Sequence, residues 1–137
     1  MGLVGPLVAG QVPARAATFT VTTFADVVNA VDGVTSLREA VQAANGNGVD
    51  DTIVLAAGAY PLTLCGGPLS HTEASALTIQ GNGATITQTC PDTGVIESTH
   101  DDSSLTLIDL AINGGPNSGA LVFGPGVYGE GAVHLDT

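Results

Sequence analysis

Asp51-Thr52-Ile53-Val54-Leu55 begins a series of four short, strand-like segments that decides the expected fold. It is followed by Leu77-Thr78-Ile79, Leu105-Thr106-Leu107 and Val133-His134-Leu135. The steps along the chain from Ile53 to Ile79, then to Leu107 and then to Leu135 are nearly equal in length. In a strand, the aliphatic residues of each segment point to one face and the residue between them points to the other. We call these aliphatic residues the core ladder: Ile53, Leu55, Leu77, Ile79, Leu105, Leu107, Val133 and Leu135.

This spacing predicts an all-β fold, a right-handed parallel β-helix, in which successive strands stack about 4.8 Å apart. Further short strands are expected at 60–64, 84–87 and 110–112, and a third face at 94–96 and 120–123. Gly81-Asn82-Gly83 is expected to form a sharp corner, because Asn and Gly accept positive φ. The 19 glycines and 7 prolines suit such a fold better than a helical bundle.

The one helix that we expect lies over residues 37–45. Ser36 and Glu39 have the spacing of a capping box, and Leu37, Ala40, Val41 and Ala44 share one apolar face. Together with an edge strand, this helix would form an N-terminal cap over residues 17–50 that covers the end of the solenoid.

Residues 51–137 would then hold the coils of the β-helix. The last coil is unfinished at Thr137, and no polar cap follows it. We therefore expect either the N-terminal portion of a longer protein or end-to-end self-association through the open coil.

Residues 1–16 have features of a secretion signal. Gly2 to Val12 is apolar, and Ala14-Arg15-Ala16 before Ala17 fits a cleavage site with small residues at the first and third positions. No positive charge precedes the apolar run, so two interpretations remain open: the remnant of a truncated signal peptide, or a loose apolar extension. The first predicts a secreted or cell-surface protein.

Cys65 and Cys90 are separated along the chain by almost one coil, and should lie on adjacent strands. The spacing of neighbouring strands falls within the Cα separations that a disulfide accepts. Two separate buried thiols are the alternative. Export would favour the disulfide.

The chain is strongly acidic, with 13 Asp and Glu residues against Arg15 and Arg38, and its formal net charge is −11. This charge argues against nucleic acid and anionic membrane surfaces as partners. No apolar run reaches the roughly 20 residues of a membrane span, so no membrane insertion is expected. No cofactor is expected either, except that an acidic polysaccharide would require a bridging cation such as calcium.

Few residues are candidates for catalysis. A hydrolase would use two carboxylates about 5 to 9.5 Å apart, and the candidates are Asp92 with Glu97, or Asp101 and Asp102 with Asp109. Arg38, the one cation beyond the signal-like segment, is more simply a helix-surface residue or a salt-bridge partner. His71, His100 and His134 lack the spacing of metal ligands, although His100-Asp101-Asp102 could contribute to a calcium site. Catalysis within these residues is therefore not expected.

Residues 35–45, Thr-Ser-Leu-Arg-Glu-Ala-Val-Gln-Ala-Ala-Asn, and residues 51–64, Asp-Thr-Ile-Val-Leu-Ala-Ala-Gly-Ala-Tyr-Pro-Leu-Thr-Leu, resemble a known family. It is the CSLREA-type N-terminal region of secreted bacterial, pectate-lyase-like β-helix proteins, and the resemblance extends over about residues 18 to 137. Thr35 stands where the family has its leading cysteine.

The resemblance implies an exported surface or extracellular protein rather than a particular reaction. The expected role is non-catalytic: a structural or adhesin-like domain whose lateral faces meet carbohydrate or a cell-surface protein. The alternative is the N-terminal portion of a carbohydrate-active enzyme, a polysaccharide lyase or glycoside hydrolase, whose catalytic residues lie downstream.

Overall fold

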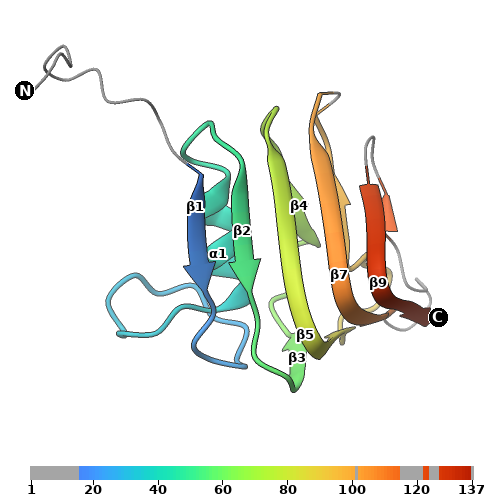
Figure 1. The fold of residues 1–137 in the computed structure, drawn as a ribbon. Helices are drawn as coiled ribbons and strands as arrows, with labels where there is room; N and C mark the ends of the chain where they lie inside the picture. The colour runs from blue at the N-terminus through green and yellow to red at the C-terminus, as the bar shows by residue number, and fades with distance from the viewer. Residues whose placement is uncertain (1–15, 101, 115–121, 124–126, 137) are drawn as a thin grey trace, which may run out of the picture.

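The computed structural model describes residues 16–100, 102–114, 122–123 and 127–136, which form one helix and nine strands. These are β1 (Ala17–Thr20), α1 (Leu37–Ala44), β2 (Asp51–Val54), β3 (Ala59–Leu62), β4 (Leu69–His71), β5 (Ala76–Gln88), β6 (Ile96–Ser98), β7 (Ser104–Asn113), β8 (Val122–Phe123) and β9 (Val127–Asp136). The main sheet has the order β1-β2-β5-β7-β9, and β3 also pairs with β5; a smaller sheet has the order β4-β6-β8. All the strand pairs of both sheets in the described residues are parallel (Figure 1).

The first steps of the core ladder have the predicted register. Ile53 pairs with Ile79, and Ile79 pairs with Leu107. The last step is wrong, because Leu107 pairs with Gly129 rather than with Leu135. Val133 and Leu135 instead pair with Leu110 and Ile112, in the second half of β7. The connection from β7 to β9 is shorter than the earlier ones, so a constant period does not hold there.

The predicted fold class, an all-β right-handed parallel β-helix, is also wrong. The expected separate strands at 77–79 and 84–87 are two halves of one 13-residue strand, β5. Gly81-Asn82-Gly83 therefore forms no corner between two faces, because it lies at a shift of register between Gln80 and Ala84 within that strand. The described residues form a small mixed α/β domain, with one helix and a main parallel sheet of five strands in sequence, β1-β2-β5-β7-β9, beside which β3 pairs with β5; no solenoid or β-helix is evident in them.

The core lies between the main sheet and the elements packed against it. The ladder residues up to Leu107 are at most 2% exposed, and they belong to one apolar cluster that also includes four residues of α1: Leu37, Ala40, Val41 and Ala44. Val133 and Leu135 lie in β9, beyond the side chains that the structure describes. Because α1 supplies part of the same core, the helix belongs to the domain itself.

Helix α1 begins with the predicted capping box. The backbone N–H of Glu39 donates to Ser36 Oγ over 3.1 Å, and the backbone N–H of Ser36 donates to Glu39 Oε1 over 2.8 Å. The helix ends one residue earlier than predicted, with Asn45 as its C-cap. In Figure 1 it lies behind β1 and β2, and it also contacts β4.

Cys65 and Cys90 form a disulfide, with their Cα atoms 5.5 Å apart, as the first alternative predicted. The bond joins the segment after β3 to the segment after β5, just beyond the last pair of these two strands, Leu62 and Gln88. Among the described residues, no helix is long and apolar enough to cross a membrane. The signal-like residues 1–15 and the third-face residues 120–121 lie outside the described residues.

Candidate functional site

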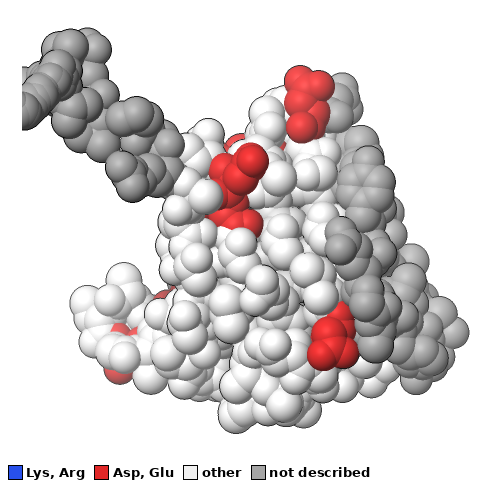
Figure 2. All heavy atoms as spheres, viewed as in Figure 1, with Lys and Arg blue, Asp and Glu red and all other residues white. Residues whose placement is uncertain are grey.

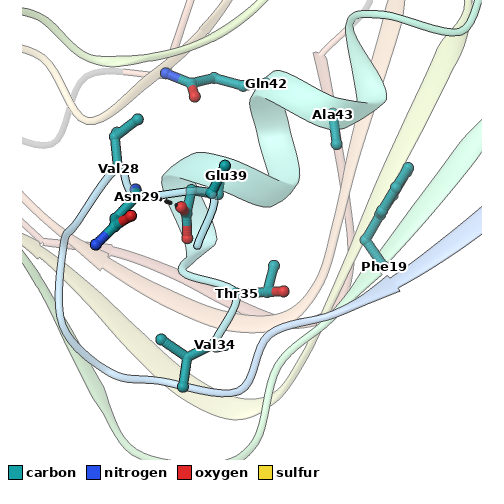
Figure 3. Close-up of a pocket in the computed structure, with 9 residues that line it drawn as sticks. Phe19, Val28, Asn29, Val34, Thr35, Glu39, Gln42 and Ala43 are labelled. Atoms are coloured by element: carbon teal, nitrogen blue, oxygen red, sulfur yellow. Dashed lines mark hydrogen bonds between the residues drawn. The ribbon is translucent and has the colours of Figure 1, made fainter. Parts of the chain in front are cut away.

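A groove of about 470 Å³ lies between α1, β1 and the loop that joins them (Figure 3). It is lined by Phe19, Val28, Asn29, Ala30, Val34, Thr35, Glu39, Gln42 and Ala43. Figure 3 shows Phe19 and Ala43 on one side of the groove and Val28 and Asn29 on the other. This is the best candidate for a binding site in the part of the chain that the structure describes.

The carboxylate in the groove, Glu39, is already engaged in structure. Its Oε1 accepts from the backbone N–H of Ser36, and its Oε2 accepts from the backbone N–H of Asn29 over 2.7 Å. The hydrogen bonds from Ser36 and then Asn29 hold the pKa of Glu39 below its ordinary value. Glu39 therefore ties the loop to the helix as an ionised acceptor, and it is poorly suited to act as a general acid.

The other lining residues offer apolar surface and neutral polar groups. Val28 is 54% exposed and Val34 is 39% exposed, whereas Phe19 is half-buried against the core. Asn29 and Gln42 are exposed and carry amide groups at the rim. Exposed apolar side chains beside neutral hydrogen-bonding groups suit a ligand with both characters, such as a neutral sugar or a peptide.

A second polar site consists of Asp26, Arg38 and residues 63–67. It joins α1 to the loop that precedes it and to the segment that follows β3. Asp26 Oδ1 accepts from Arg38 Nε over 2.8 Å, and Oδ2 accepts from Arg38 Nη2 and from the backbone N–H groups of Thr63 and Leu64. Arg38 also donates to the carbonyl oxygens of Gly67 and Leu64. We call this set the Asp26 network.

The Asp26 network is a structural ion pair. Burial disfavours the charged form of Asp26, but the hydrogen bonds from Arg38, Leu64 and Thr63 outweigh this, so the pKa of Asp26 lies below its ordinary value. The Asp26 side chain is 1% exposed and that of Arg38 is 12% exposed. Of the two structural roles expected for Arg38, the salt-bridge partner is the one observed, and its side chain is largely withdrawn from solvent.

The carboxylates considered for catalysis occupy different parts of the fold. Asp92 is exposed after β5, and Glu97 lies in β6, where its Oε2 accepts from Ser70 Oγ over 2.8 Å. Asp102 is exposed in the turn before β7, and Asp109 is exposed within β7. Asp101 lies outside the described residues. Among the described members of this set no hydrogen bond joins one carboxylate to another, so the structure supplies no argument for a catalytic pair.

The three histidines also occupy separate positions. His71 is buried at the end of β4, with Nε2 2.8 Å from the carbonyl oxygen of Ser75. His100 is exposed, and its Nδ1 accepts from the backbone N–H of Asp102. His134 lies in β9 and pairs with Ala111. Within the described residues, no group of three or more His, Cys, Asp or Glu residues is arranged to hold a metal ion.

Two buried carboxylates escaped the sequence reasoning: Asp26 and Asp51. Both are less than 9% exposed. Asp26 is one of several Asp and Asn residues in the loop before α1, and nothing in its local sequence distinguishes it. Asp51 precedes an aliphatic strand, which could have indicated burial, but its partners come from distant segments: Ala17 and Asn47.

The geometry thus favours a binding groove and a structural ion pair over a catalytic centre. The resemblance to a CSLREA-type region rests on the residues quoted for it and stays a prediction. Compared with protein-family models, with curated proteins and with solved structures, the chain matches none.

Proposed function

We propose that this chain is a non-catalytic structural domain of an exported protein, and that it contacts neutral carbohydrate or protein through the groove beside α1. The observation that carries the proposal is the disulfide between Cys65 and Cys90. Disulfides persist in oxidising compartments outside the cytoplasm, and small domains use them to supplement a modest core. Export and disulfide formation are therefore mutually consistent.

The polar residues of the chain support a structural role. The two acidic groups beside α1, Asp26 and Glu39, each accept from two backbone N–H groups. Arg38 is engaged by Asp26. These groups fix loops to α1, and none is left free to transfer a proton.

The charge of the surface restricts the ligand. Figure 2 shows acidic side chains spread over the viewed face, with no Lys or Arg among the described residues on it. With a formal net charge of −11, an anionic polymer would be repelled. A neutral carbohydrate or a protein with basic or neutral groups meets no such barrier.

Cell fractionation tests the export part of the proposal. The protein should be found outside the cytoplasm, and its two cysteines should react with an alkylating reagent only after reduction. Recovery from the cytoplasm with two reactive thiols would overturn it.

The groove is tested by titrating neutral oligosaccharides and short basic peptides into the oxidised protein while amide chemical shifts are followed. Shifts should map to residues 28–43 and should be lost in Gln42→Ala. Gln80→Ala is the matched control, because Gln80 is also exposed but lies in β5. Equal effects of both substitutions, or no shift with either ligand class, would reject the groove as the contact site.

A further inference from the structure

The amino end of β1 coincides with a possible processing point in the sequence. Ala14-Arg15-Ala16 has the small residues that a signal peptidase requires at the first and third positions before the cleaved bond. Strand β1 starts at Ala17, the residue that would follow the bond, and Ala16 is exposed. Two unrelated features, the cleavage pattern and the start of the fold, therefore meet at one peptide bond.

A buried carboxylate faces the nitrogen of this bond. Ala17 pairs with Asp51 in the register of β1 and β2, and its backbone N–H donates to Asp51 Oδ1 over 2.9 Å. Asn47 Nδ2 donates to the same oxygen over 3.0 Å. Asp51 is only 4% exposed, and its Oδ2 has no hydrogen-bond partner among the described residues.

An unpaired buried carboxylate oxygen is costly, and folded proteins normally give such an atom a partner. The peptide nitrogen of Ala17 carries one hydrogen and no charge. A free α-ammonium group at the same position carries three hydrogens and a positive charge. It would keep the bond to Oδ1 and supply the charge and donors that Oδ2 lacks.

We propose that the chain is cleaved between Ala16 and Ala17, and that Asp51 binds the new α-ammonium group of Ala17. Water is the co-reactant, and a signal peptidase of the exporting cell is the catalyst. The C–N bond breaks, the hydroxyl of water joins the Ala16 carbonyl carbon, and the nitrogen of Ala17 takes up protons to become the ammonium. This inference shares the assumption of export with the proposed function and adds a specific site.

The chain offers an unusually clean chemical test, because both of its basic residues are arginines and it has no lysine. After cleavage, the α-amine of Ala17 would be the only primary amine in the protein. An N-hydroxysuccinimide acetate reagent would acetylate that group alone and remove its charge. A neighbouring carboxylate stabilises the ammonium form, so the folded protein should also react more slowly than the unfolded one.

The parent chain, Asp51→Asn and Asp50→Asn are produced in the source cells with a lysine-free C-terminal tag, purified, and weighed by mass spectrometry. Asp50→Asn is the matched control: Asp50 is exposed, and its Oδ1 accepts from the backbone N–H of Ala76, a bond that an amide oxygen can keep. The parent should begin at Ala17. Acetylation should lower Tm by at least about 3 °C in the parent and in Asp50→Asn, and should leave Asp51→Asn unchanged.

If Asp51→Asn does not fold, the parent alone still decides the matter. Its α-amine should react at least about tenfold more slowly in native buffer than in urea at the same pH. This is the change expected if Asp51 raises the pKa of the amine by about one unit, because only the neutral amine is acetylated. A different first residue, equal Tm losses in all three proteins, or equal reaction rates in buffer and urea would overturn the proposal. A protein found outside the cytoplasm but not cleaved at Ala17 would overturn this inference alone, whereas a cytoplasmic protein with free thiols would overturn the proposed function too.

Discussion

Replacing Asp26 by Asn should destabilise the domain strongly, although the two side chains have almost the same shape. Oδ2 of Asp26 accepts three hydrogen bonds, and Oδ1 accepts one from Arg38 Nε. An asparagine has one oxygen and one NH₂ group. In either orientation its NH₂ group points at hydrogen-bond donors, and the charge of Arg38 loses its partner.

The size of the effect follows from burial. Removing one partner of a buried ion pair typically costs about 3–5 kcal/mol, because the remaining charge stays buried and uncompensated. Arg38 keeps two long hydrogen bonds, of 3.3 Å to the carbonyl oxygen of Gly67 and 3.4 Å to that of Leu64. We therefore expect the free energy of unfolding to fall by an amount near the lower end of this range, about 3 kcal/mol, which is a large part of the stability of a small domain.

Urea unfolding followed by circular dichroism at pH 7 measures this loss by linear extrapolation. The control is Asp32→Asn, which makes the same change of charge at an exposed position of the same loop. Asp32 Oδ1 accepts from the backbone N–H of Val34, a bond that an asparagine keeps, so its free energy of unfolding should change by less than about 0.5 kcal/mol. If Asp26→Asn loses no more than Asp32→Asn, the reasoning is refuted.

The same variant gives a pH signature. The pKa of Asp26 is lowered from 3.8 in the folded protein, so its ionised form contributes stability above that unfolded-state value. This contribution is lost as the pH falls from about 4 through the folded pKa. The difference in unfolding free energy between the parent and Asp26→Asn should therefore be constant from pH 5 to 7 and should shrink below pH 4. A difference that grows in acid would contradict this sign.

Three further substitutions or treatments test the rest of the fold. Reduction of Cys65–Cys90 should cost about 3 kcal/mol in the chain-entropy model, and the native oxidised protein should show no free thiol in a colorimetric titration. Leu107→Asp should unfold the domain, because Leu107 is 2% exposed in the core. Thr106→Asp, one residue away on the opposite face of β7, should retain a cooperative thermal transition by circular dichroism. Equal behaviour of the two variants would contradict the strand register. Gly81→Ala should lower Tm by several degrees, because an added Cβ would overlap a backbone carbonyl oxygen of β7, and an unchanged Tm would show that β5 and β7 can separate freely there.

Local chemical patterns accounted for the parts of the structure that were predicted correctly. The capping box depends on two residues three positions apart, Ser36 and Glu39, and its hydrogen bonds form within one turn of helix. The pairing of Ile53 with Ile79 follows from matching two aliphatic strands, and the disulfide follows from that same register. In each case the relevant distance is fixed by the backbone of one or two neighbouring elements.

The fold class was missed because a corner between two strands and a register shift within one strand require the same local backbone conformation. Asn82 and Gly83 both have positive φ, 53° and 86°, which either structure would require. A contact outside this segment distinguishes the register shift from a corner: Asn82 Nδ2 donates over 2.8 Å to the carbonyl oxygen of Leu55, the residue that follows β2. No property of residues 81–83 alone reveals this contact.

The polar sites were missed for a related reason. Asp26 lies in an irregular loop and Arg38 lies on a helix 12 residues further along the chain, so no periodic pattern connects them. The expectation for Arg38 left a helix-surface residue and a salt-bridge partner open, and it did not identify Asp26 as the partner. The burial of Arg38 depends on the route of residues 63–67, whose backbone groups complete the Asp26 network.

Residues 63–67 are held in two different ways, and this bears on how the domain meets its surroundings. Cys65 binds them covalently to the segment after β5, and the Asp26 network binds them to α1. The network engages Arg38, the one basic residue beyond Arg15, within the fold. The cation that could have bound an anionic ligand therefore stabilises a loop instead, and the outer surface keeps its acidic excess. A domain built this way gains rigidity at one edge, and for the binding that we propose its net charge would favour neutral or basic partners.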